Sequence, residues 1–193
     1  MYRIGILTTR NSMRWVKALE QEKPAQCEFT YIPYESLEHA KDLYVSGSPH
    51  FDGFIFSGEI PYFYIQNNVQ DLLKPIGCFE VMQKDFYKAL SQVMYKKPGF
   101  AMKRAFVDFL FVENHYMGLG EWLPEDDFPY IHDQHIKSYT VDGLYDHVIG
   151  KIVDLWKRGE IDHVFTRLSN LPDLLKPYGI EPVFVHPSVN SMH

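Results

Sequence analysis

Arg3-Ile4-Gly5-Ile6-Leu7, followed directly by Thr8-Thr9-Arg10-Asn11-Ser12, opens the chain and decides its fold class. The apolar run predicts a buried β-strand, and the polar residues after it predict a turn that leads into a helix. The same order recurs, with strands predicted over residues 27–32 and 54–56 and a helix over residues 37–45 between them. Strands that alternate with helices predict an α/β protein with a mainly parallel sheet and right-handed crossovers.

The C-terminal part of the chain repeats this alternation. An amphipathic helix is predicted over residues 144–156, followed by a strand over 162–166, a short helix over 171–176 and a last strand over 182–185. Residues 104–112, between the two halves, are strongly apolar. They fit either a strand or the start of a helix that runs to Trp122, and the pattern does not decide between the two.

A short string occurs twice in the chain. Residues 71–77 (DLLKPIG) and 173–179 (DLLKPYG) are identical at six of seven positions. An apolar strand is predicted after each copy, and a strand that begins at an acidic residue, Asp52 or Asp162, is predicted before each. This agreement predicts two Rossmann-like lobes of one βαβ plan, over residues 1–97 and 98–193, in which the two strings form equivalent helices.

The two copies differ in the segments that come after them. After the first, the chain enters a predicted helix over residues 85–95, whereas after the second, Ser188 resembles an N-cap with no helix behind it. We therefore expect a fragment of a longer chain, cut beyond its last strand. A naturally frayed terminus is the alternative.

Composition and charge exclude several classes of protein. Hydrophobic residues make up 46% and charged residues 23% of the chain, as in ordinary globular proteins. The formal net charge is −6, and no lysine and arginine cluster is interleaved with aromatics, which argues against nucleic-acid binding by this segment. With no signal peptide and no stretch of ~20 apolar residues, we expect a cytoplasmic protein that does not enter a membrane.

Polar clusters follow several predicted strands, where ligands of open α/β sheets bind. Hydroxyl groups, amides and two arginines in these clusters suit a carboxylate or a phosphate, and tyrosines would form walls. The predicted ligand-binding residues are Thr9, Arg10, Asn11, Ser12, Ser57, Gly58, Tyr62, Tyr64, Glu113, Asn114, Thr166, Arg167, Ser169 and Asn170.

Signs of catalysis or metal binding are weak in the sequence. GxGxxG, GxxxxGK[ST], GxSxG and HExxH are all missing. Cys27 and Cys78 have no metal-type spacing and are predicted to be reduced, mostly buried thiols. The acidic and histidine-bearing residues 125–135 lie in a predicted loop without fixed ligand spacing, so we expect no metal and no cofactor.

The string 51–58 (FDGFIFSG), residues 76–81 and the helix around DFYKAL (85–90) resemble the N-terminal sensor domain of the propionate catabolism activator family. Residues 161–167, 171–175 and 183–188 are similar to its second lobe. The resemblance implies two Rossmann-like lobes, like those of type 1 periplasmic-binding proteins, a small carboxylate ligand recognised inside the cell, and an effector domain in the same polypeptide. The family's glycine-rich turn after the late strand is replaced here by residues 166–169 (TRLS).

Three functions remain open on this basis. The first is the small-molecule-sensing domain of a cytoplasmic transcriptional regulator, in which an anionic or polar metabolite binds in a cleft between lobes and biases a covalently attached output domain. The second is a small α/β enzyme of racemase or transferase type that uses the same cleft. Residues 76–80 faintly resemble the second-cysteine motif of cofactor-independent amino-acid racemases, although Ser57 stands where the partner cysteine is expected. The third is a structural or dimerisation domain without a ligand, and a homodimer is left open for all three.

Overall fold

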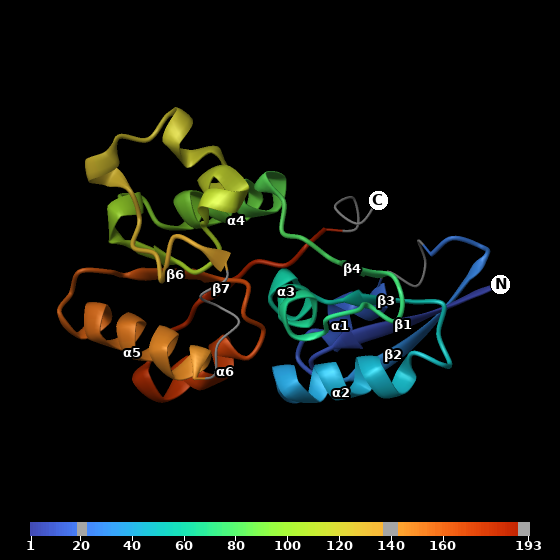
Figure 1. The fold of residues 1–193 in the computed structure, drawn as a ribbon. Helices are drawn as coiled ribbons and strands as arrows, with labels where there is room; N and C mark the ends of the chain where they lie inside the picture. Colours follow the sequence, from blue (N-terminus) through green and yellow to red (C-terminus); the bar gives the residue numbers. More distant parts are fainter. Residues whose placement is uncertain (19–22, 137–142, 189–193) are drawn as a thin grey trace. The chain divides into compact units, whose positions relative to one another are not determined.

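A computed structural model of the chain describes residues 1–18, 23–136 and 143–188 (Figure 1). The chain divides into a first unit, Met1–Glu80 together with Pro187 and Ser188, and a second unit, Val81–His186. The boundary therefore lies before α4 (Gln83–Lys96) and not at the predicted residues 97–98. The reason is packing, because Phe86 of α4 meets aromatic rings of the second unit.

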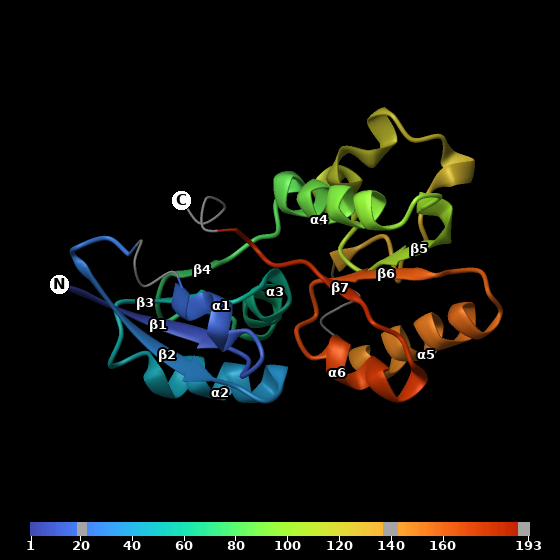
Figure 2. The ribbon, with the colours of Figure 1, turned by 180° about the vertical axis from the view of Figure 1, so that it is seen from behind.

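The first unit contains a four-stranded sheet of order β2-β1-β3-β4, in which every pair is parallel (Figures 1 and 2). Its strands are β1 (Tyr2–Thr8), β2 (Cys27–Pro33), β3 (Gly53–Phe56) and β4 (Ile76–Cys78), and its helices are α1 (Met13–Ala18), α2 (Leu37–Gly47) and α3 (Glu59–Asn68). The strands predicted over residues 3–7, 27–32 and 54–56 and α2 are present, whereas the strand predicted after the first repeated copy begins earlier, at Ile76 inside that copy. The pattern did not predict α3. Pro61 is compatible with this helix because it lies in the first turn, where a backbone N–H has no partner within the helix.

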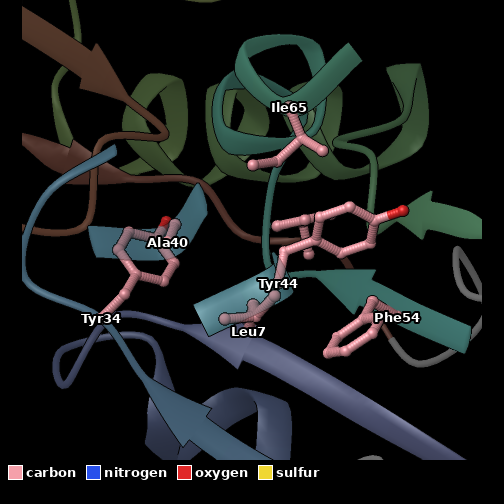
Figure 3. Close-up of a cluster of buried hydrophobic side chains, with 7 residues drawn as sticks. Leu7, Tyr34, Ala40, Tyr44, Phe54 and Ile65 are labelled. Atoms are coloured by element: carbon pink, nitrogen blue, oxygen red, sulfur yellow. The ribbon is translucent and has the colours of Figure 1, made fainter. Parts of the chain in front are cut away.

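Alternation along β1 divides the core of the first unit between two faces of the sheet. Leu7 packs with Tyr44 of α2 and Ile65 of α3 on one face (Figure 3), whereas Ile6 packs with Val16 of α1 on the other. Gly5 is required beside this core, since a Cβ there would lie 2.7 Å from the Phe54 ring.

The second unit contains a three-stranded parallel sheet of order β5-β6-β7. Its strands are β5 (Ala105–Val107), β6 (His163–Thr166) and β7 (Val183–Phe184), and its helices are α4, η2 (Met102–Arg104), η3 (Val112–Glu121), η4 (Glu125–Asp127), α5 (Leu144–Lys157), α6 (Leu171–Leu175) and η6 (Lys176–Tyr178). Figures 1 and 2 show α4 on one face of this sheet and α5 and α6 on the other. Phe86 of α4 contacts Phe109 and Phe165, with ring centroids 5.4 and 5.9 Å apart.

The ambiguous apolar segment begins as a strand. β5 ends at Val107, and the next four residues, 108–111, are buried before η3 begins. A parallel bridge joins Phe106 to Tyr130 on the side of β5 away from β6. The order bridge-β5-β6-β7 therefore matches β2-β1-β3-β4, and the two units share one topology.

Equivalent backbone hydrogen bonds support this duplication. They join Asp52 to Arg3 and Asp162 to Arg104 at the amino ends of the strands, and Phe79 to Phe56 and Val185 to Thr166 at the carboxyl ends. The two repeated strings follow equivalent strands, β3 and β6, and the first runs into β4 whereas the second ends before β7. They take different conformations, so the prediction of two equivalent helices is wrong. The second copy enters α6 and η6, whereas residues 71–75 are irregular and run straight into β4.

The predicted end of the fragment, beyond Ser188, lies outside the described residues. Within the described ranges, no helix has both the length and the apolar character that a membrane span needs.

Candidate functional site

The strand order reverses between β1 and β3 in the first unit, and between β5 and β6 in the second. Ligands of open α/β sheets bind at the carboxyl ends of the strands that flank such a reversal. In the first unit this edge brings together the predicted clusters around Thr9 and Ser57, since the Ser57 N–H donates to the Leu7 carbonyl at 2.9 Å. The cluster around Arg167 lies at the matching edge of the second unit.

Side chains after β1 form hydrogen bonds within their own turn. Thr9 Oγ1 accepts from the Ser12 backbone N–H at 3.2 Å, and both residues are buried. Arg10 is exposed over 79% of its side chain and pairs with Glu35 at 3.4 Å, while Asn11 is exposed. This cluster therefore presents a surface arginine and not a buried cation.

The residues after β3 form the N-cap and the first turns of α3. Gly58 is its N-cap in an extended conformation, and a Cβ there would meet no atom within 4 Å. Tyr64 on α3 donates its hydroxyl to Glu38 of α2 at 2.6 Å, and the Tyr62 hydroxyl accepts from Gln66 at 2.9 Å. Tyr64 thus connects α3 to α2, whereas Tyr62 bonds within α3.

Cys78, at the end of β4, has the properties of a thiol and not of a thiolate. Burial, with a smaller contribution from Glu80, raises its pKa to about 12. A nucleophile needs the opposite shift. Cys27 and Cys78 are both free, and both are half-buried, whereas the sequence predicted them to be mostly buried.

The edge of the second unit is built on Asp108, which follows β5 and has no solvent exposure. One of its oxygens accepts from the Thr166 hydroxyl, and the other accepts from the Arg167 backbone N–H at 3.0 Å. Thr166 Oγ1 in turn accepts from the Leu168 N–H at 2.9 Å. Burial raises the pKa of Asp108 to about 7, although these hydrogen bonds oppose the rise. Asp108 therefore fixes the course of the turn after β6.

Arg167 carries a positive charge on this turn. Its side chain is half-buried, its two terminal nitrogens are shielded from solvent, and its guanidinium carbon lies 4.9 Å from the centroid of the Phe111 ring. Burial lowers the pKa of Arg167 to about 9, which leaves the group cationic at neutral pH. A cation over an aromatic face in a shielded position can attract an anion strongly.

Tyr145 and Asn170 add polar groups to the same edge. Tyr145, the second residue of α5, forms a side-chain hydrogen bond with Asn170, the N-cap of α6. Burial, and then the charge of Asp108, raise the pKa of Tyr145 to about 12, so its hydroxyl remains a donor. Ser169, beside Asn170, is half-buried.

Glu113 and Asn114 form side-chain hydrogen bonds that stabilise the loop in which they lie. Asn114 accepts from the Phe111 N–H at 3.0 Å and donates to the Phe109 carbonyl at 2.8 Å. Glu113 bonds His135 at 3.2 Å and accepts from the Ile136 N–H at 3.4 Å. Asn114 thus acts on the site through Phe111, whose position beneath Arg167 it helps to set.

The loop with acidic residues and histidines is tied to its surroundings. Asp127 pairs with Lys103 at 3.0 Å, and Asp133 accepts from the His135 N–H at 2.9 Å. In the part of the chain that the structure describes, no three His, Cys, Asp or Glu side chains are placed to hold a metal ion together.

Sequence reasoning missed Asp108, Phe111 and Tyr145. An acidic residue inside the apolar run 104–112 was the available indication for Asp108, because a carboxylate in such a run needs specific partners. Phe111 and Tyr145 had no such indication, since aromatic residues are frequent throughout the chain.

The fold is similar to that of a solved structure described as the crystal structure of an NtrC family transcriptional regulator from Clostridium acetobutylicum. The two chains are 16% identical and align with a TM-score of 0.60 over 99% of this chain and 90% of that one. No protein-family model matches the chain, and no curated protein matches it. At this identity the likeness concerns the fold: the chain is an α/β protein with parallel sheets, built on the same plan as that regulator.

Proposed function

We propose that this chain is the ligand-sensing domain of a cytoplasmic transcriptional regulator and binds a small anionic or polar metabolite. The fold, similar over nearly its whole length to a solved transcriptional regulator, supports the regulatory part of the proposal. The sequence resemblance to the propionate catabolism activator family agrees with it and suggests a small carboxylate as the ligand.

The observation that carries the proposal is the position of Arg167. It follows β6 at the reversal of strand order, with its charged group shielded from solvent on the Phe111 ring. An anion beside the guanidinium would favour its charged form and thus oppose the effect of burial on its pKa. Ser169, Asn170 and Tyr145 would supply directional hydrogen bonds, and Asp108 would hold the turn in place.

Sensing requires only that the ligand binds two states of the protein with different affinity. The turn 167–170 is anchored to β5 through Asp108, so a ligand bound there acts on both strands. We expect an attached output domain to respond to that change.

The test combines a ligand screen with two matched arginine variants. Thermal shift against small carboxylates, phosphates and sugars would identify ligands, and calorimetry would measure their affinity. Arg167→Gln should weaken binding roughly ten- to a hundredfold, since a lost charge-assisted hydrogen bond costs ~1.5–3 kcal/mol. Arg158→Gln, on the surface at the end of α5, is the control and should leave affinity unchanged.

Equal affinity of the Arg167→Gln variant and the parent for every ligand found would contradict the proposal. Arg10→Gln asks whether the first-unit cluster contributes as well, and its exposure predicts a smaller loss. The ligand should also be recovered unchanged after binding. Turnover that is abolished by one substitution without loss of binding would favour the enzyme alternative.

A further inference from the structure

The outer face of α4, in the second unit, combines exposed apolar side chains with lysines. We call this face the α4 surface; it comprises Lys84, Tyr87, Lys88, Met94, Tyr95 and, from the end of η3, Trp122. The exposed fractions of Met94, Tyr95 and Trp122 are 56%, 89% and 56%. Side chains this large and this exposed are unusual when they gather on one helix.

Helix geometry places these groups together. Phe86, Leu90 and Val93 face the core of the second unit, so the opposite side of α4 faces outward. Tyr87 and Met94 are two turns apart on one flank of α4, between the core-facing side and the outward side. Lys84, Lys88 and Tyr95 lie on the outward side next to this flank, with Lys84 and Lys88 one turn apart. The apolar stripe of Tyr87 and Met94 is therefore bordered by Lys84 and Lys88 on its solvent side.

Trp122 is held on this face by a hydrogen-bonded chain. Its indole N–H donates to the Tyr87 hydroxyl at 3.1 Å, which donates to the Met117 carbonyl at 3.0 Å. The ring centroids of Tyr87 and Trp122 are 6.4 Å apart. The exposed indole is thus fixed in orientation before any partner arrives, which lowers the entropic cost of an interaction.

A turn with unusual backbone angles, between β5 and Trp122, produces this arrangement of Tyr87 and Trp122. His115, Tyr116 and Met117 have φ values of 50°, 50° and 54°, and Gly118 has 74°. A left-handed run of three residues other than glycine is unfavourable, and such strain is concentrated at functional sites. Here it brings the chain from β5 back onto α4.

The charge of this surface is opposite to that of the whole chain. Lys84 and Lys88 on this surface are exposed, as are Lys96 and Lys97 at the C-terminal end of α4, while Asp85, the acidic residue of α4, is buried and accepts from the Met82 N–H at 3.0 Å. Glu121, beside Trp122, is an exposed acid at its border. A concentration of positive charge on a chain of net charge −6 favours a negatively charged partner.

We propose that the α4 surface docks an acidic amphipathic helix of a partner protein, whose apolar side chains cover Trp122, Tyr87 and Met94 and whose carboxylates pair with the flanking lysines. Tryptophan and tyrosine are the residue types that most often dominate binding energy at interfaces. A second copy of this chain fits less well, because a two-fold pairing of α4 with itself would bring lysines against lysines. The proposal is independent of the ligand site at Arg167.

The probes are two amphipathic helical peptides of about 14 residues, with the same leucine stripe and either glutamate or lysine at all other positions. Calorimetry with the full chain should show binding of the glutamate peptide and no binding of the lysine peptide. Lys88→Glu and Met94→Glu should each weaken the affinity for the glutamate peptide by at least about tenfold. Lys157→Glu, an equal charge reversal on an exposed residue of α5, should leave its affinity within about twofold.

Equal binding of both peptides, or a Lys88→Glu effect no larger than that of Lys157→Glu, would overturn the proposal. So would self-association of the chain that Met94→Glu abolishes, since the partner would then be a second copy. Binding to anionic phospholipid vesicles without binding to the glutamate peptide would assign the surface to a membrane instead. Far-ultraviolet circular dichroism of each variant verifies that α4 remains folded.

Discussion

Asp108 is a carboxyl group without solvent exposure at the centre of an apolar segment. Two donors from the end of β6 bind its oxygens, and burial still raises its pKa from 3.8 to about 7. The folded protein therefore binds a proton more tightly at this position than the unfolded chain does. The stabilising contribution of the neutral form is fully present below the unfolded pKa and is lost as pH rises through about 7.

Asp108→Asn tests this linkage at the scale of one residue. The amide keeps an acceptor for the Arg167 N–H and cannot ionise. Between about pH 5 and pH 8, the free energy of unfolding should fall by roughly 2 kcal/mol more in the parent than in the variant. Denaturant unfolding at both pH values measures the difference, and Asp126→Asn in the exposed η4 is the charge control. Parallel pH profiles of the parent and Asp108→Asn would show that the carboxyl group titrates normally.

At the scale of elements, one string takes two conformations because its two surroundings differ. In the first unit, strand β4 begins at Ile76, inside the copy, so residues 71–75 have to extend toward it. In the second unit β7 begins only at Val183, which leaves room for a helix and for Gly179 at its C-terminus, where φ is 70°. The extended copy also has a partner in the core. The Tyr44 hydroxyl accepts from the Lys74 N–H and donates to the Lys74 carbonyl, both at 2.9 Å.

Tyr44→Phe should therefore destabilise the protein, because it leaves both backbone groups of Lys74 without this partner. We expect a loss of about 1–3 kcal/mol in the free energy of unfolding. Tyr178→Phe, at an exposed tyrosine of the second copy, removes the same hydroxyl at a surface position and should have little effect. Denaturant titration of both variants gives the comparison. Similar values for the two would mean that Tyr44 contributes through its ring alone.

At the scale of the whole molecule, each unit has its own sheet and its own buried core. Phe54 is 2% exposed in the first unit, and Phe165 is fully buried in the second. The two units repeat one strand order, and each has a reversal of that order. Such units can open separately when their stabilities differ.

Phe54→Ala should destabilise the first unit selectively, so that its strands open to solvent more often. Removing a buried phenylalanine costs about 3–5 kcal/mol. Hydrogen exchange followed by mass spectrometry should show faster exchange in β1 to β4, with β5 to β7 nearly unchanged. Phe165→Ala should give the reverse pattern. Uniform loss of protection in either variant would instead indicate that the chain unfolds as one cooperative body.

The fold class and part of the candidate site could be predicted from local patterns. Apolar runs and polar turns specify strands, helices and their alternation, and alternation is sufficient for a parallel sheet. The same reasoning placed Thr166 and Arg167 at the carboxyl end of a strand, where the structure has them. The boundary of the units, α3 and the conformation of residues 71–75 were not predictable in this way.

Local pattern by itself determined that this protein is a parallel α/β chain with polar turns after its strands. The tertiary structure decided which of those turns hold a shielded charge. Asp108 and Thr166 are 58 positions apart, and no local pattern relates them until β5 and β6 pair. Phe111 comes beneath Arg167 for the same reason. Contacts between distant residues depend on sheet register and packing, which are properties of the whole fold and not of any short stretch of sequence.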